Sequence, residues 1–263
     1  MAVYQTKARE RIKKSLRRYK NLAEGAKANK LSEADTRTIV TSFLGEALGW
    51  DTFSDLTGEY RIRGNYADFA VKDGADLFAI IEVKAAGTTL GPKHLYQAVS
   101  YAANEGVEWV YLTNGDDWHV YRVVFNKPVE QDLAFKVSLS GEVMKPADKV
   151  ELFYLLSKEA RRTDELDAYY QRHVALCGSN VANMLLSEKI LTLLRTELRK
   201  AHGHKATLEE LATIMVNEVF CADVQGEDMA RLVKRAAAAG KRAKRTPVAA
   251  AGASGEAGAV GPS

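Results

Sequence analysis

The chain has 263 residues, a net charge of +3 at neutral pH and 46% hydrophobic residues, which fits one ordinary domain with an appendage or two small domains. No apolar run approaches the ~20 residues of a membrane span, and the N-terminus lacks the apolar segment of a secretory signal. Its two cysteines, Cys177 and Cys221, lack the spacing of a disulfide framework or zinc knuckle, so we expect a soluble cytoplasmic protein that does not contact a membrane.

Residues 4–30 are rich in Lys, Arg, Ala and Glu, contain no proline and are predicted to form a basic helix. Residues 1–30 carry a net charge of +8 and residues 231–245 a net charge of +7, which leaves −11 on residues 31–230. Clusters of Lys and Arg provide phosphate affinity that does not depend on sequence. The two basic ends are equally compatible with nucleic-acid binding and with a simple role in solubility.

A second helix is predicted to begin at Ser32, which is a favourable N-cap residue. Glu33 and Asp35 fall in its first turn, where the helix dipole stabilises acids. Apolar residues recur at helical spacing between residues 39 and 48, and Gly49 is expected to end the helix.

Strands are predicted over residues 58–63, 65–72 and 77–84 from alternating or apolar β-rich patterns. A helix follows over residues 90–106, with Pro92 in its first turn and Gly106 at its end. Residues 107–114 and 118–125 predict two more strands joined by a turn. The order α-β-β-β-α-β-β indicates an α/β unit of ordinary domain size.

From about residue 146 the pattern becomes helical, with apolar residues at helical spacing over 147–162, 179–203 and 206–220. Thr207 and Glu210 have the spacing of a capping box, and the low-complexity end of the chain is expected to be disordered. We therefore expect four parts: a basic helix over 1–30, an α/β domain over 31–145, a helical region over 146–240 and a disordered tail over 241–263. The helical region is compatible with dimerisation, DNA clamping or partner docking.

Three charged residues interrupt the apolar strands. Glu82 and Lys84 are two residues apart, so they share one face of their strand, together with Phe78 and Ile80. A turn around residues 73–74 would fold the preceding strand back, and a hairpin of this length would place Asp68 next to Glu82.

Two carboxylates that converge repel each other unless a cation lies between them. Oxygen ligands of this kind suit Mg²⁺, and the carbonyl of Val83 would be a further ligand. Lys84 would then orient a water or offset phosphoryl charge, which completes the requirements for metal-assisted phosphodiester hydrolysis. The alternative is an ordinary solvated ion pair at the end of a strand.

This Asp…Glu-x-Lys pattern in an α-β-β-β-α-β frame resembles the PD-(D/E)xK nuclease superfamily. More narrowly, "GEYRIRGNYADFAV", "IIEVKAAG" and "YQAVSYAANEGVEWVYLTNGDDWHVY" resemble the N-terminal nuclease domain of type I restriction enzyme R subunits and their stand-alone relatives, over about residues 33–125. The resemblance implies a restriction-endonuclease-like αβββαβ core with a mixed sheet, followed here by a helical C-terminal region. R subunits also carry a motor, but this sequence has no G-x-x-x-x-G-K-[ST] loop.

The resemblance assigns Asp68 and Glu82 to metal binding, with the Val83 carbonyl, and Lys84 to catalysis. Ala67 replaces the proline of the superfamily name, as in many relatives. The cofactor implied is Mg²⁺, for which Mn²⁺ is expected to substitute.

Gln97 and Tyr101 match the Q-x-x-x-Y element of this branch, and their spacing places them on one helix face. On residue type alone, a helix face that covers the sheet is the better explanation for them. The outer acid of the family falls on Glu33, with Glu46 as a weaker candidate near the other end of that helix.

The sequence thus predicts a Mg²⁺-dependent DNA endonuclease, and the resemblance implies restriction or defence against foreign DNA. Phosphates would be held by basic residues, namely Lys13, Lys14, Arg17, Arg18, Lys93 and the segment 231–245. A homodimer, and a motor or specificity partner, would complete such a system. The rival is a catalytically silent nuclease fold that binds DNA or protein, and RNA is a further alternative substrate.

Overall fold

The computed structural model describes residues 3–62, 65–220, 234 and 238. The chain forms two compact units, Met1–Gln171 and Arg172–Ser263. The four-part division expected from sequence stays a prediction, and the expected tail over 241–263 lies outside the described residues, as does nearly all of the basic segment 231–245. None of the described helices combines the length and apolar character needed to cross a bilayer.

The first unit contains a six-stranded sheet in the order β1-β2-β3-β4-β5-β6. The strands are β1 Leu56–Ile62, β2 Asn65–Asp73, β3 Asp76–Val83, β4 Trp109–Thr113, β5 Asp117–Val124 and β6 Glu130–Ser138. Neighbouring strands are antiparallel except β3 and β4, which are parallel. A parallel pair requires a crossover connection, and helix α3 Pro92–Glu105 provides it. The mixed α/β sheet expected from the sequence is confirmed.

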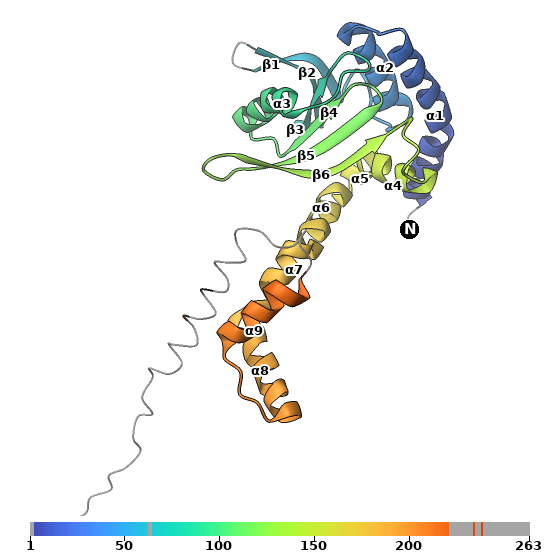
Figure 1. Cartoon of the computed structure of the whole chain (residues 1–263). Helices are drawn as coiled ribbons and strands as arrows, with labels where there is room; N and C mark the ends of the chain where they lie inside the picture. The colour runs from blue at the N-terminus through green and yellow to red at the C-terminus, as the bar shows by residue number, and fades with distance from the viewer. Residues whose placement is uncertain (1–2, 63–64, 221–233, 235–237, 239–263) are drawn as a thin grey trace, which may run out of the picture. The chain divides into compact units, whose positions relative to one another are not determined.

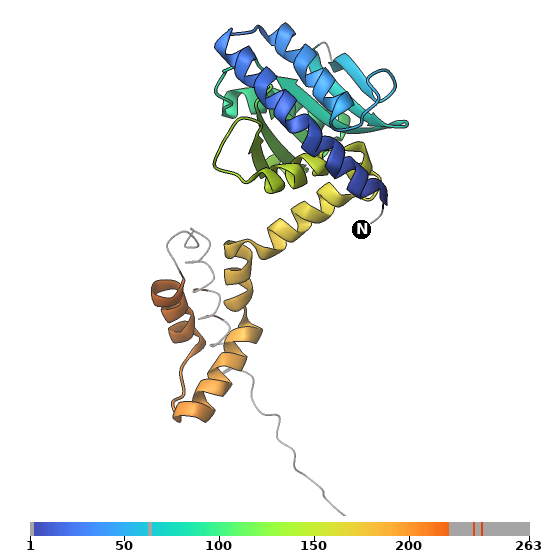
Figure 2. The same cartoon turned by 90° about the vertical axis from the view of Figure 1, so that its right-hand side faces the viewer.

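Helices cover both faces of this sheet. Helices α1 Val3–Ala28 and α2 Glu33–Glu46 lie on one face, and α3 lies on the other (Figure 1; Figure 2). The local signals for these helices are confirmed: the Ser32 side chain accepts a hydrogen bond from the backbone N–H of Asp35. Pro92 is in the first turn of α3, and Gly106 ends α3 in the left-handed conformation that glycine adopts without strain.

Each face of the sheet has its own core. On the α3 side, Leu95, Val99 and Ala102 pack against Ile80 and Leu112 of the sheet. On the α2 side, the ring of Phe43 lies 5.0 Å from Tyr19, 5.5 Å from Trp118 and 5.1 Å from Phe153, measured between centroids. The expectation that Trp50, Trp109 and Trp118 are core residues is confirmed, because all three are buried.

The sheet departs from the sequence expectation at two places. Strand β6 follows the expected strands, and the first half of it is exposed, which obscures the alternation that would reveal it. A register shift near Val71 and Lys72 leaves Phe78 without a direct partner on β2. Phe78 stacks on Trp50, whereas Ile80 packs in the α3-side core. The expectation that Phe78 and Ile80 share a face is therefore wrong, because a bulge interrupts the two-residue period.

The helices after the sheet are shorter than the sequence pattern indicates. The segment 147–162 forms α4 Pro146–Leu155 and α5 Lys158–Arg161, separated where Ser157 caps α5 by accepting from the N–H of Ala160. Helix α6 Glu165–Leu176 follows.

The second unit contains α7 Gly178–Leu185, α8 Glu188–His202, α9 Leu208–Ile214 and the π-helix η1 Met215–Val219. Leu186, Leu191, Leu208 and Leu211 belong to its small hydrophobic core. The capping box predicted for Thr207 and Glu210 is confirmed.

Candidate active site

The β2–β3 hairpin places the predicted acids side by side. Phe69 pairs with Ile81 and Ala70 with Ile80, so the same register, continued by one residue, sets Asp68 opposite Glu82. Asp68 Oδ2 accepts a hydrogen bond of 2.8 Å from the backbone N–H of Val83. The juxtaposition of the two acids follows from the turn and from the register of the two strands.

Lys84 joins this pair from the end of β3. Its ammonium group donates a 2.6 Å hydrogen bond to Glu82 Oε1 and lies 3.6 Å from Glu33 Oε2 on α2. Burial lowers the pKa of Lys84, but the hydrogen bond to Glu82 and the surrounding carboxylates outweigh burial and raise this pKa overall. The lysine is therefore a firmly protonated cation held between two carboxylates.

Glu82 is the most buried acid of the group, with only 3% of its side chain exposed. Burial raises its pKa to about 7, against the lowering effect of the Lys84 hydrogen bond, and the negative charges of Asp68 and Glu33 add to the increase. Its second oxygen, Oε2, is buried and has no hydrogen-bond partner. A buried acceptor without a donor is costly, so this oxygen would gain from a positively charged neighbour.

Arg37 contacts Asp68 from the next turn of α2 after Glu33. Its guanidinium lies 3.3 Å from Asp68 Oδ1 and 3.5 Å from Glu59 Oε1. The pKa of Asp68 is nevertheless raised, because burial and the charge of Glu33 outweigh the lowering effects of the Val83 N–H, Arg37 and Lys84. The sequence analysis missed Arg37, although its position four residues after Glu33 puts it on the same helix face.

Thr36 fixes the start of α2 beside the end of β3. Its hydroxyl donates to the carbonyl of Ser32 at 2.8 Å and accepts from the backbone N–H of Ala86 at 3.1 Å. Ala86 lies two residues after Lys84, and Thr36 lies between Glu33 and Arg37 in the sequence. This buried hydroxyl therefore positions the side chains of α2 relative to the lysine. A threonine within a helix carries no sequence signal for such a role.

The other predicted residues, Lys93, Gln97 and Tyr101, belong to α3. Gln97 donates a 2.9 Å hydrogen bond to the hydroxyl of Tyr101. Tyr101 is buried in the α3-side core, whereas Gln97 and Lys93 are exposed. Their functional roles stay predictions.

Glu46 is not part of the acid cluster. It bonds to Arg18 at 2.5 Å and to the hydroxyl of Tyr19 at 2.9 Å. Because α1 engages this carboxylate, the structure favours Glu33 over Glu46 as the acid of α2 that accompanies Lys84.

The donor chemistry of the cluster fits a hard divalent cation. Within the described residues, no group of three or more His, Cys, Asp or Glu side chains is arranged to hold a metal ion. Asp68 and Glu82 are two carboxylates, however, and Glu82 has the unpartnered oxygen Oε2. Mg²⁺ is commonly bound through one or two carboxylates, with water and substrate phosphate as its remaining ligands.

A mixed sheet with two carboxylates and a lysine at the end of its β2–β3 hairpin is consistent with an α/β core of the nuclease-like fold. Residues 32–133 match the family model of the type I restriction enzyme R protein N terminus. The match covers the whole cluster and confirms the resemblance to the N-terminal domain of R subunits. Searches of curated proteins and of solved structures found no match.

The raised pKa of Glu82 predicts a pH dependence of stability in the metal-free protein. Glu82 binds its proton more tightly in the folded protein than in the unfolded chain, where its pKa has the ordinary value of 4.5. Its contribution to stability is therefore complete below about pH 4.5 and is lost as the pH rises through about 7. The loss amounts to about 3 kcal/mol at most. In EDTA, urea unfolding between pH 5 and pH 8 should show this decline in the native protein, and Glu82→Gln should flatten it.

Glu105→Gln, at an exposed site on α3, is the matched control and should retain the native pH dependence. Identical pH profiles for the native protein and Glu82→Gln would show that Glu82 is not the group responsible.

Arg37 is expected to stabilise the ionised form of Asp68. Replacing it with alanine removes the nearest cation from Asp68 Oδ1, so the pKa of Asp68 should rise further. Carbon-13 NMR titration of the Asp68 carboxyl measures this change directly. Arg37→Lys should restore part of the difference, and an unchanged titration in Arg37→Ala would contradict the assigned contact.

Proposed function

We propose that this protein is a Mg²⁺-dependent DNA endonuclease of a restriction system. The observation that carries the proposal is the convergence of Asp68, Glu82 and Lys84 at the end of the β2–β3 hairpin, inside the segment that matches the R-protein N terminus. Neither the acids nor the family match alone would carry it, because clustered charges also occur at structural sites.

Asp68 and Glu82 would hold the cation, with the carbonyl of Val83 as a third oxygen. When bound, the ion would neutralise phosphoryl charge and lower the pKa of a coordinated water. Asp68 is held by the N–H of Val83 through Oδ2, and binding the cation through Oδ1 would require the cation to replace the contact with Arg37. Mn²⁺ is expected to replace Mg²⁺ because it accepts the same oxygen ligands.

Lys84 would orient the attacking water or bind a phosphoryl oxygen. An ammonium group has three N–H donors. Glu82 accepts from one of them, and Glu33 lies nearby at 3.6 Å. Donor capacity therefore remains for a water or a phosphate. Glu33 is a positioning residue in this scheme, because it acts on the substrate through Lys84.

The exposed residues around the core would bind the DNA backbone. Lys13, Lys14 and Arg17 are basic residues of α1, and Lys93 is exposed on α3. Arg18 is already paired with Glu46, so we expect Arg18 to contribute less to binding of the DNA backbone. Gln97 is exposed and is held by Tyr101, which suits a role in substrate positioning. Cleavage of both strands would further require a second site, supplied by a homodimer or a partner.

One observation favours the rival function, a silent nuclease fold that binds DNA or protein. Both oxygens of Asp68 already have partners, the N–H of Val83 and the guanidinium of Arg37. An Asp68 carboxylate that is compensated in this way needs no external cation. The distinction therefore depends on whether a metal ion can replace the interaction with Arg37.

Plasmid cleavage tests the proposal. Purified protein should nick or linearise DNA in Mg²⁺, and Asp68→Ala, Glu82→Ala and Lys84→Ala should each reduce the rate at least about a hundredfold, because each removes a group needed in the transition state. Labelled RNA in the same assay identifies the alternative substrate. EDTA should abolish cleavage.

Matched controls are the exposed residues Glu105→Ala and Lys136→Ala, which should keep the native rate. Circular dichroism confirms that each variant is folded. Equal background cleavage by the native protein and all site variants would favour the silent module.

The basic helix gives a separate prediction about binding. Lys14→Ala should lower the slope of log affinity against log salt concentration by about 0.9 if Lys14 neutralises one phosphate of duplex DNA. Arg18→Ala should lower this slope by less, since Glu46 already compensates the guanidinium. Fluorescence anisotropy of a labelled duplex over a salt series measures both slopes. Equal reductions in the two variants would contradict the assignment of Arg18.

A further inference from the structure

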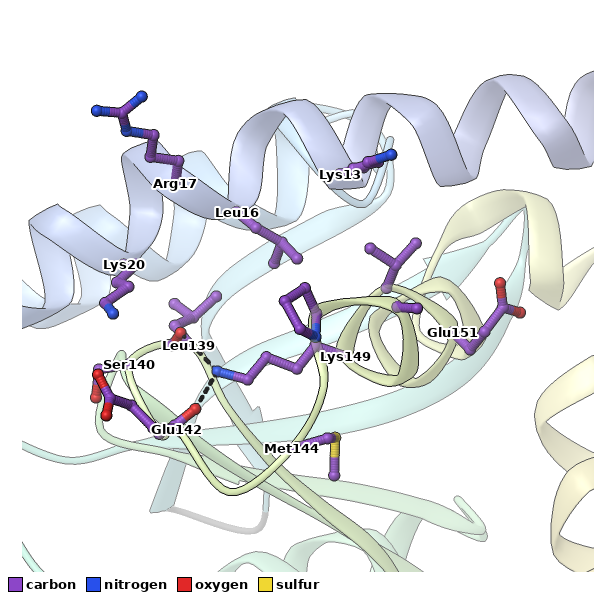
Figure 3. Close-up of a pocket in the computed structure, with 14 residues that line it drawn as sticks. Lys13, Leu16, Arg17, Lys20, Leu139, Ser140, Glu142, Met144, Lys149 and Glu151 are labelled. Atoms are coloured by element: carbon purple, nitrogen blue, oxygen red, sulfur yellow. Dashed lines mark hydrogen bonds between the residues drawn. The ribbon is translucent and has the colours of Figure 1, made fainter.

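A cavity of about 850 Å³ lies in the first unit between α1, the loop that follows β6, and α4 (Figure 3). None of its lining residues belongs to the acid cluster described above. It is lined by Lys13, Leu16, Arg17, Lys20, Leu139, Ser140, Gly141, Glu142, Met144, Pro146, Ala147, Lys149, Val150 and Glu151. Its volume is within the usual range for sites that bind small molecules.

Much of the lining is aliphatic. Leu16 points from α1 toward the side chain of Lys149, and Leu139 and Met144 come from the loop before α4 (Figure 3). Val150 contributes from α4 itself. An apolar body placed here would be removed from water at a gain of roughly 25 cal/mol per Å² of its surface.

Lys149 supplies a buried positive charge in this cavity. The residue is only 8% exposed, and its ammonium group donates to the carbonyl of Leu139 at 3.0 Å and to the carbonyl of Gly141. Across the described chain, no carboxylate lies within ion-pair distance of it. Two of its three N–H donors are satisfied by these carbonyls, and its charge is left without a direct counterion.

A second ammonium group, that of Lys20, lines the same cavity. Lys20 points from α1 toward the loop that carries Ser140 and Glu142, whereas the guanidinium of Arg17 turns away (Figure 3). The positive charge of Lys20 adds to burial in lowering the pKa of Lys149, against the opposing charges of Asp116 and Glu142. Two cations that repel each other favour an anion between them.

The carboxylates of the cavity compensate this charge only in part. Glu151 is held by two 2.9 Å hydrogen bonds from Arg9. This leaves Glu142, on the loop, as the acid that compensates the positive charges of Lys13, Lys20 and Lys149. Lys20 itself lies 3.7 Å from Glu24, an exposed pair of the kind that contributes little. The balance of charge at the cavity is therefore positive.

We propose that this cavity binds a small organic phosphate, with its phosphate group between Lys20 and Lys149 and its apolar body against Leu16, Met144 and Val150. A phosphomonoester is close to a dianion at neutral pH and has three acceptor oxygens, which matches two ammonium groups better than a carboxylate does. A nucleoside and a medium-length alkyl chain are two sources of such a body. The binding site is additional to the proposed nuclease site.

Isothermal titration of the full chain tests the proposal with adenosine 5′-monophosphate, octyl phosphate, inorganic phosphate and uncharged adenosine. At least one of the two organic phosphates should bind at least about tenfold more tightly than inorganic phosphate and adenosine, a difference of about 1.4 kcal/mol. The organic phosphate that binds more tightly identifies the kind of apolar body. Failure of both to bind, or equal binding of inorganic phosphate, would overturn the proposal.

Two pairs of variants locate the binding. Ala147→Trp fills the cavity from α4, whereas Asp148→Trp adds the same ring at the next, non-lining position. Lys20→Glu reverses a lining charge, whereas Lys7→Glu reverses an exposed charge on the same helix that does not line the cavity. The first member of each pair should weaken binding at least about tenfold, and the second should leave binding unchanged.

Thermal unfolding followed by circular dichroism verifies that each variant folds. Native affinity in a folded Ala147→Trp variant would contradict binding in the cavity. Titration with a short DNA duplex tests the alternative that this surface binds the DNA backbone. If Lys20→Glu weakens only the duplex and no small phosphate binds, the surface is a docking site for the DNA backbone and the proposal fails.

Discussion

The buried carboxylate of Glu82 is the constraint on which the arrangement of the first unit depends. An acid with 3% of its side chain exposed is unfavourable in its charged form unless a cation accompanies it. Lys84 provides that cation at 2.6 Å, and Lys84 in turn is close to Glu33 of α2. The strand that fills the centre of the sheet is therefore coupled electrostatically to the helix that covers one of its faces.

The charges of the cluster do not balance. Four carboxylates, those of Glu33, Glu59, Asp68 and Glu82, share the two cations Lys84 and Arg37. Full ionisation would leave two negative charges on the cluster. Burial is the main cause of the raised pKa values of Asp68 and Glu82, and the neighbouring negative charges add to the increase. A proton on Glu82 would neutralise one of these two charges, and a bound divalent cation would neutralise both.

The sequence predicted the part of the site that depends on local periodicity. The side-chain alternation of a strand and the position of one turn sufficed to bring Asp68 and Glu82 together. The same rule failed at Phe78, because a bulge is a property of the strand pair rather than of one strand. Strand β6 was missed because its first four residues are exposed. Arg37 was missed because its partners, Asp68 and Glu59, are remote in sequence.

Helix α2 links the two surfaces that the proposed function requires. Glu33 and Arg37 near its start contact the cluster, and Glu46 at its end bonds to Arg18 and Tyr19 of the basic helix α1. At about 1.5 Å per residue, these ends are about 20 Å apart. That distance corresponds to about six nucleotides along one strand. Phosphates bound near Arg18 would therefore belong to a different part of the duplex from the bond to be cleaved, so α1 would contribute to affinity without entering the chemistry.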